Sequence, residues 1–561
     1  MKTAALAGLG LLQILPSTAE YVWPSQYDYL EDLRYLQSGY IREGFVDGVN
    51  PCDFSSAGAG RQTAAEWVRT AYHDMSTHDA AAGTGGLDAS IMFETERDEN
   101  VGDAFNGTFG FTNNYHTIRA STADLIALST VVAVGRCGGP KIPFRVGRID
   151  ATEAGPLGVP KPDQDIDTHT QIFAKAGFNT SDMIAMVACG HTLGGVHGKN
   201  FPEITLNSSD TNFEHFEADD SFSLFDNAVV TEYLDDSTDN LLVHGPNATL
   251  NSDARVFAAD NNATMRALSD AATFQSSCAS ILGRMIDAVP AGVALSDTFA
   301  TDPIPIKPYI TSLALLNATH ISFTGRIRVY LTPAGTQPDA HTVSLTYLPA
   351  RDVDTNTNGT ALNTTISTVR ATYRLGTSVG LFGETFTWHE FSTTIPAASG
   401  IAGFNVTVVD RASGAATVYD NAGSATGYPL DDSFMYLAKR SCSAVPAGDD
   451  ANTSVRRDVT VRAAVRKDVL AEDGSVAVDV VKKVARVGVA VPKLEVERWE
   501  ESEAGKASRE EVGDWVVFEV TGRVEGDGLS TTFDILSGEK KIEYQRTGAL
   551  LDQPCSALAA A

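Results

Sequence analysis

The sequence predicts a multidomain protein with an all-α domain followed by one or two all-β, sandwich-like modules. Its 561 residues suffice for three or four domains at roughly 150 residues each. From about residue 25 to 295, the pattern of apolar residues is mainly helical. Near 302–305, which reads Asp-Pro-Ile-Pro, the pattern changes to alternating apolar and polar residues, as in a β-sandwich.

The first 19 residues are typical of a secretory signal peptide. Lys2 precedes a mostly apolar stretch at 3–15, and the small residues 17–19 end it. The apolar stretch is too short to span a bilayer comfortably. The alternative to a signal peptide is a buried N-terminal helix. After a signal peptide at 1–19, we expect the helical domain at 20–297.

Four stretches carry the clearest helical signals of that domain: 64–73, 121–135, 181–195 and 263–288. In the second and third, Ser, Thr or Asp stands where an N-cap is needed, and glycines stand at the end. The last range is expected to form one or two helices.

The β-rich part is expected to begin at 298. Segments such as 320–332 and 403–410 alternate apolar and polar residues, which predicts a module over 298–445. Residues 443–458 are typical of a linker. We therefore expect 446–561 to form a second β-rich module or to continue the first.

Charge and composition exclude several classes of protein. Acidic residues outnumber basic ones 71 to 42, so the formal charge is −29. Such a chain repels phosphate backbones and anionic lipids, which disfavours nucleic-acid binding. No second apolar run approaches 20 residues, so no membrane span is expected. Ten Asn-X-Ser/Thr triplets spread along the chain favour an exported glycoprotein, in which disulfides can form.

Two histidines are candidates for chemistry. Arg69 and His73 are four residues apart and share one face of a helix. His191 ends an apolar helix, and Asp253 is a candidate hydrogen-bond partner for the His191 ring. Taken separately, each has a simpler interpretation: a surface Arg beside a half-buried His, and a hydrogen-bonded core His.

Taken together, these residues lie in an ordered set of motifs. Residues about 40 to 290 resemble the plant, fungal and bacterial haem-peroxidase superfamily, and most closely its secreted fungal class II enzymes. The matching motifs are RTAYHD (69–74), GGLDASIMFE (85–94), Asn100, CGGPKIPFRVGRID (137–150), VPKP (159–162), MVACGHTLG (186–194), DDSFSLFDN (219–227) and NSD (251–253).

The resemblance implies a secreted enzyme of the donor:hydrogen-peroxide oxidoreductase class that contains haem b. In such enzymes H₂O₂ oxidises ferric haem to an oxo-iron state, and small phenolic or other aromatic donors return it to rest by one-electron steps. The β modules fall outside the resemblance, and we expect them to bind wall polysaccharide, to shield the peroxidase surface or to add solubility.

The resemblance also implies roles for individual residues. His191 would be the axial ligand of haem iron, with Asp253 accepting its ring N–H. His73 would be the distal base that moves a proton of the peroxide, and Arg69 would stabilise the charge that develops as the O–O bond breaks.

Four further residues would complete the haem site. Asn100 would hold His73 in one tautomer, and Glu94 would support that network. The Pro160 carbonyl would face the haem edge where reductants dock. Tyr72 stands beside the distal His, where the family usually has Phe or Trp.

The resemblance implies two calcium sites as well, built from the hard oxygen ligands that Ca²⁺ prefers. The first would use Asp74, Asp88, Ser90 and the Gly86 carbonyl, and the second Thr192, Asp219, Ser221, Asp226 and the Leu224 carbonyl. The alternative for either set is an acidic surface turn.

Cys52 and Cys137 fit a disulfide of the family. Cys189 is expected to be a small buried residue rather than a ligand. Cys442 and Cys555 flank the last module and are candidates to join its ends, which leaves Cys278 without a clear partner.

Manganese- and lignin-type members of the family have residues for electron transfer that this sequence lacks. The manganese-binding carboxylates correspond here to Gln62, Glu66 and His197, and a surface Trp corresponds to Met186. We therefore expect a generic peroxidase. The alternatives are a manganese- or lignin-type enzyme with an unrecognised site, and an inactive haem-binding or wall-associated protein. Ala218 replaces an aromatic residue often found below the haem, and Phe216 is a candidate to compensate.

Overall fold

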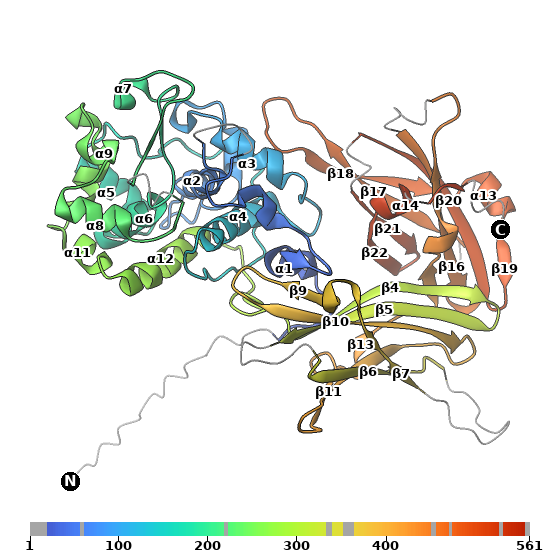
Figure 1. Ribbon diagram of the computed structural model, residues 1–561. Helices are drawn as coiled ribbons and strands as arrows, with labels where there is room; N and C mark the ends of the chain where they lie inside the picture. Colours follow the sequence, from blue (N-terminus) through green and yellow to red (C-terminus); the bar gives the residue numbers. More distant parts are fainter. Residues whose placement is uncertain are drawn as a thin grey trace, which may run out of the picture.

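Figure 1 shows a helical domain beside two β-rich modules, in the order expected from the sequence. The computed structural model describes residues 20–55, 61–217, 223–331, 339–351, 364–449, 456–470, 474–526, 531–551 and 553–555. The expected signal peptide at 1–19 therefore lies outside the described residues. The predicted multidomain fold class, all-α followed by all-β, is confirmed.

The helical domain packs around a large apolar core that includes Trp67, Phe105 and Phe144, and it has a smaller cluster around Phe216 and Leu242. Its helices are α1 (Asp28–Tyr35), α2 (Thr63–Met75), α3 (Ala104–Thr112), α4 (Thr122–Arg136), α5 (Ile166–Lys175), α6 (Thr180–Gly190), α7 (Pro202–Thr205), α8 (Ala228–Asp235), α9 (Leu241–His244), α10 (Ser252–Phe257), α11 (Ala263–Leu268) and α12 (Ala271–Ile286). A short ribbon, β2 (Gly195–His197) with β3 (Phe213–His215), lies within it.

Capping side chains set the starts of two of these helices. The Ser121 hydroxyl accepts the amide of Asp124 at the start of α4, as the sequence predicts. At α6 the cap is Asn179, two residues before the predicted Ser181, and it forms a capping box with Asp182. The difference arises because Asn179 satisfies an amide that Ser181, already inside the helix, cannot reach.

The first β module is a pair of sheets around a shared core that includes Phe323, Phe391 and Phe404. One sheet has the order β1-β9-β10-β5-β4 with β8 on β10, and the other β12-β11-β6-β7 with β13 on β11. Their bounds are β1 (Ser38–Gly39), β4 (Ile306–Asn317), β5 (His320–Leu331), β6 (His341–Leu348), β7 (Thr365–Ser367), β8 (Val369–Arg370), β9 (Thr377–Val379), β10 (Thr385–Pro396), β11 (Gly403–Asp410), β12 (Ala416–Tyr419) and β13 (Tyr428–Pro429).

The second β module is another sheet pair, around Trp499, Phe518 and Phe533. Its sheets have the orders β14-β16-β20-β19, with β15 on β16, and β18-β17-β21-β22. Their bounds are β14 (Phe434–Tyr436), β15 (Cys442–Ala444), β16 (Arg456–Arg466), β17 (Ala477–Val484), β18 (Lys493–Glu500), β19 (Glu510–Val512), β20 (Trp515–Glu525), β21 (Thr532–Ser537) and β22 (Lys540–Arg546). Because β14 and β15 pair with β16, residues 434–444 belong to this module rather than to the first.

A buried ionic cluster joins the helical domain to the first β module. Glu31 of α1 receives hydrogen bonds from Lys307 of β4 (3.0 Å) and Arg328 of β5 (2.8 Å), and Lys307 also donates to Asp32 (2.8 Å). Burial by itself raises the pKa of Glu31, but the two cations outweigh it and lower that pKa to about 2. The anion is therefore retained inside the junction.

Removing the Glu31 carboxylate leaves two buried cations without their main counter-charge. We expect Glu31→Ala to lower the free energy of unfolding by about 3–5 kcal/mol, measured by chemical denaturation. Arg498→Ala, which breaks an exposed pair with Asp479 (2.7 Å), is the control and should leave the midpoint nearly unchanged. Equal effects of the two substitutions would contradict the role of the cluster.

Candidate functional site

A cavity of about 900 Å³ lies between α2 and α6 and brings the two candidate histidines to one space. His73 enters from α2, and His191 enters from the C-terminal end of α6. Pro160 and Tyr72 also line this cavity. His73, Pro160 and His191, which are widely separated in sequence, thus line one cavity.

His73 is held by a side-chain amide. Its Nδ1 lies 2.8 Å from Asn100 Oδ1, and Asn100 Nδ2 donates to the backbone carbonyl of Glu94 (3.0 Å). Because that amide oxygen accepts only, Nδ1 carries the ring proton and Nε2 keeps its lone pair. Burial, reinforced by the Arg69 cation, lowers the pKa of His73 to about 3, so the ring is neutral near pH 7.

Arg69 lies one helical turn before His73. Its Nε donates to His73 Nε2 (3.3 Å), and its NH2 donates to the Val101 carbonyl (3.0 Å). Its guanidinium lies 4.8 Å from the centre of the Phe105 ring. Burial lowers the pKa of Arg69 to about 10, which still leaves it charged near neutrality. A neutral base therefore stands beside a fixed cation.

On the opposite side, His191 donates from Nδ1 to Asp253 Oδ2 (2.7 Å). Asn240 Nδ2 donates to the same oxygen (2.9 Å). The ring of Phe216 stacks on His191 with centroids 4.3 Å apart and planes 19° apart. Because Nδ1 carries the proton shared with Asp253, the other ring nitrogen of His191, Nε2, has a lone pair available to a ligand.

The cavity fits a haem. Both imidazoles have an unprotonated Nε2, and that of His73 accepts a hydrogen bond from Arg69 Nε (3.3 Å). Apolar side chains such as Phe173, Leu282 and Met285 also line the cavity. A planar macrocycle needs apolar walls and an axial imidazole with a held Nδ1, and this donor set provides both.

Glu94 acts through its backbone. Its carbonyl binds Asn100, while its carboxylate accepts the amide of Gly155 (2.6 Å) and pairs with Arg97 (3.2 Å). Glu94 therefore contacts the Asn100–His73 network through its backbone carbonyl, whereas its carboxylate binds elsewhere.

The residues of the first expected calcium site lie together and are buried. The amides of Ala89 and Ile91 donate to the Asp74 carboxylate (2.7 and 3.0 Å), and the Ser90 amide donates to Asp88 Oδ1 (3.0 Å). Burial, reinforced by the charge of Asp88, raises the pKa of Asp74. Gly86 is adjacent, since its carbonyl accepts the Asp88 amide (2.9 Å).

The second expected calcium site is described only in part, because Asp219 and Ser221 lie outside the described residues. The Thr192 hydroxyl lies 2.7 Å from the Asp226 carbonyl and 2.8 Å from Glu217 Oε1. Leu224 is exposed. The residue missed from the sequence is Glu217, a buried carboxylate whose pKa is raised by burial to about 9. Across the described ranges, no cluster of three or more His, Cys, Asp or Glu side chains is arranged to hold a metal.

The positions that correspond to a manganese site, Gln62, Glu66 and His197, line the same cavity. Arg61 Nε donates to Glu66 Oε1 (2.5 Å), so that carboxylate is already paired with a cation. A metal ion at this position would compete with Arg61 for the Glu66 carboxylate.

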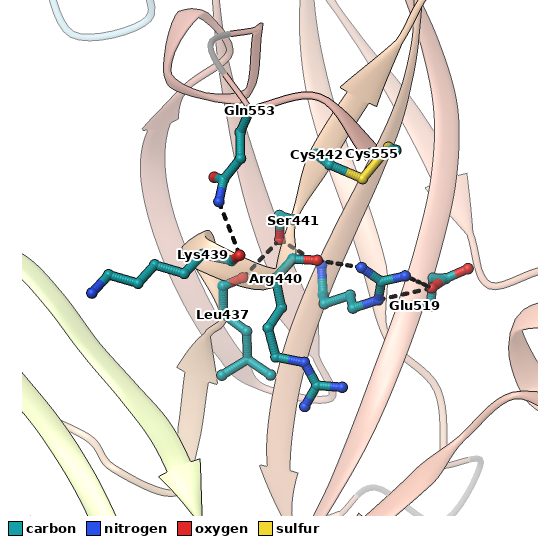
Figure 2. Close-up of a disulfide and its surroundings, with 9 residues drawn as sticks. Leu437, Lys439, Arg440, Ser441, Cys442, Glu519, Gln553 and Cys555 are labelled. Carbon is teal, nitrogen blue, oxygen red and sulfur yellow. Dashed lines mark hydrogen bonds and ion pairs between the residues drawn. A yellow bond between two sulfur atoms is a disulfide. The ribbon is translucent and has the colours of Figure 1, made fainter. Parts of the chain in front are cut away.

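Three disulfides are present. Cys52–Cys137 and Cys442–Cys555 form as expected, with Cα atoms 5.0 and 4.9 Å apart. Figure 2 shows the second, where Gln553 Nε2 donates to the Lys439 carbonyl (2.9 Å). Cys189 is buried, as expected, and it forms the bond that the sequence left open for Cys278: the Cα atoms of Cys189 and Cys278 are 5.5 Å apart. This bond ties α6 to α12 two residues before His191.

Comparison with known proteins decides the family. Residues 54–275 match the peroxidase family. This region is a domain of the haem-peroxidase superfamily. The chain is 43% identical over 392 residues to a WSC domain-containing protein of Arthroderma benhamiae, covering 69% of this chain and 52% of that protein. That length exceeds the peroxidase domain, so the similarity extends into the β modules.

Peroxidases named for the peroxisome and the mitochondrion are also similar to this domain. A peroxisomal L-ascorbate peroxidase of Arabidopsis thaliana is 33% identical over 33% of this chain and 62% of its own length. A mitochondrial cytochrome c peroxidase of Emericella nidulans is 33% identical over 23% of this chain and 37% of its own length. The chain thus spans about half to two-thirds of the first two relatives, and the expected closeness to class II enzymes stays a prediction.

The disulfide pattern can be tested directly. Peptide mapping without reduction should recover a Cys189–Cys278 cross-link. The double substitution Cys189→Ser with Cys278→Ser should lower the free energy of unfolding by about 2–5 kcal/mol, because the unfolded chain gains entropy. Recovery of Cys278 as a free thiol from the folded protein would contradict this pairing.

Proposed function

We propose that the protein is a secreted haem peroxidase that reduces H₂O₂ and oxidises small aromatic one-electron donors. The observation that carries this proposal is the pair of histidines that line one cavity, each held through Nδ1 by a side-chain oxygen. Each therefore has an unprotonated Nε2, and that of His73 lies beside the Arg69 cation. A core histidine needs no such arrangement. The retained network argues against an inactive scaffold, and the Arg61–Glu66 pair argues against a manganese enzyme.

Haem, when bound, supplies the iron that accepts electrons from the donor and passes them to the peroxide. His191 would hold that iron, and the Asp253 carboxylate would strengthen the ligand by accepting the ring proton of Nδ1. His73 Nε2, neutral and unprotonated, would take the proton from the inner oxygen of H₂O₂ and deliver it to the outer oxygen, which leaves as water. Arg69 would donate hydrogen bonds to the charge that develops on the departing oxygen.

The Pro160 side of the cavity is the proposed access for donors. Pro160 and Tyr72 line the cavity together with Phe173. The aromatic side chains of Tyr72 and Phe173 favour flat aromatic donors. No described helix is long and apolar enough to cross a membrane. The three disulfides support export, for which we propose the signal peptide at 1–19.

Two substitutions separate haem binding from the reaction with peroxide. His191→Ala should abolish stable haem binding and the Soret band, because the axial ligand is lost. His73→Leu should keep the haem but slow the reaction with H₂O₂ by roughly two to four orders of magnitude, followed by stopped-flow absorbance. His244→Leu, an exposed histidine outside the cavity, is the control. A nearly normal rate for His73→Leu would remove His73 as the base.

We also propose that two Ca²⁺ ions support the haem helices. Asp74 directly follows His73, and Thr192 directly follows His191, so each ion would anchor one histidine. Buried carboxylates bound by backbone amides rather than by basic side chains suit the first ion. The Thr192 hydroxyl and the Asp226 backbone suit the second ion, for which Glu217 is an additional carboxylate.

Metal removal tests the calcium sites. Elemental analysis of the purified protein should find two calcium ions per chain, and chelation should lower the melting temperature and release haem. Added Ca²⁺ should restore both, because a ligand that binds only the folded state stabilises it. Calcium-free protein with unchanged stability would contradict the two sites.

A further inference from the structure

A loop of the second β module contacts the peroxidase domain. The loop at 485–492 connects β17 to β18, and Figure 1 shows this hairpin extending toward the helical domain on the side of α3. The Ala490 amide donates to the Met92 carbonyl (2.9 Å). Asn113, which follows α3, donates from Nδ2 to the Ala490 carbonyl (3.1 Å). Both backbone groups of Ala490 are thus bound by the other domain.

Arg486 closes this loop and faces the same surface. Its guanidinium donates to the Val491 carbonyl from NH2 (2.9 Å) and from Nε (3.2 Å). It lies 5.0 Å from the centre of the Phe93 ring, and its NH2 is 3.5 Å from Met92 Sδ. Val491 is 1% exposed and belongs to the core of the peroxidase domain, whereas Val487 at the tip is fully exposed.

The segment that the loop contacts leads directly to the distal histidine. Met92 and Phe93 end the turn Ser90–Phe93. The next residue, Glu94, offers the carbonyl that binds Asn100, and Asn100 binds His73. A backbone carbonyl keeps a hydrogen-bond partner aligned only while its own segment is fixed. The loop covers this segment from outside.

We propose that Arg486 is a positioning residue for the peroxidase reaction. Through the closed loop 485–492 it holds Met92 and Phe93, and so keeps the Glu94 carbonyl and Asn100 aligned with His73. This inference rests on the proposed function, because it takes His73 as the base. It assigns to the second β module a part in the reaction, although none of its residues needs to enter the cavity.

Hydrogen–deuterium exchange of the full-length haem protein tests the mechanical part. Arg486→Ala should make the backbone amides of 91–100 exchange at least about tenfold faster, with Val487→Ala as the matched control on the same loop. Asn113→Ala removes the other contact to Ala490 and serves as the second variant if Arg486→Ala does not fold. Unchanged exchange in both folded variants would overturn the proposal.

Steady-state kinetics test the chemical part. In Arg486→Ala, kcat/KM for H₂O₂ per bound haem should fall by roughly tenfold or more, since small misplacements of catalytic groups are costly. The value for the aromatic donor should stay unchanged, whereas a general loss of structure would lower both. Faster exchange with an unchanged kcat/KM for H₂O₂ would also overturn the proposal. A wild-type protein that ignores peroxide would contradict the proposed function instead, and the exchange data are independent of that result.

Discussion

The hydrogen bond from His191 Nδ1 to Asp253 is the contact on which the proposed site depends. It directs the remaining lone pair of the ring into the cavity, and Asn240 holds the carboxylate that fixes it. Three elements converge to make this possible, because α6 carries His191, α10 carries Asp253, and Asn240 precedes α9. The Cys189–Cys278 bond then ties the end of α6 to α12. The histidine is thereby constrained on both sides.

On the opposite side of the cavity, the ring of His73 is also fixed through Nδ1, here by the side chain of Asn100. His73 must stay neutral next to Arg69, and burial together with the cation achieves this. The cost is that its ring orientation depends on Asn100 and on one backbone carbonyl. The second β module contacts the segment that carries this carbonyl, while the Glu31 cluster joins α1 to the first module. Each β module therefore makes direct hydrogen-bonded contacts with the peroxidase domain.

Much of the proposed site could be predicted from the sequence because its residues lie in motifs of fixed spacing. Arg69 and His73 share a helix face, and the pairing of His191 with Asp253 follows from the family resemblance. Asn240 and Glu217 could not be found, since their contacts depend on how separate segments pack. Cys278 could have been paired with Cys189 only by elimination.

The fold was predictable to a similar extent. The boundary between the helical and the β-rich parts could be located from the spacing of apolar residues. A helix buries residues three or four apart, whereas a strand buries every second residue. The contact between the loop 485–492 and the peroxidase domain was not predictable. Asn113 and Ala490 are 377 residues apart, and no sequence motif links the two segments. Only the folded arrangement shows that its backbone meets Met92.

An absorption spectrum of the haem-supplemented protein, before and after one equivalent of H₂O₂, shows whether the cavity binds a haem that reacts with peroxide. We expect a ferric Soret band that shifts with peroxide and returns when a phenol is added. A haem band that ignores peroxide would contradict the proposed chemistry, and the absence of any haem band would contradict the assignment of the cavity itself.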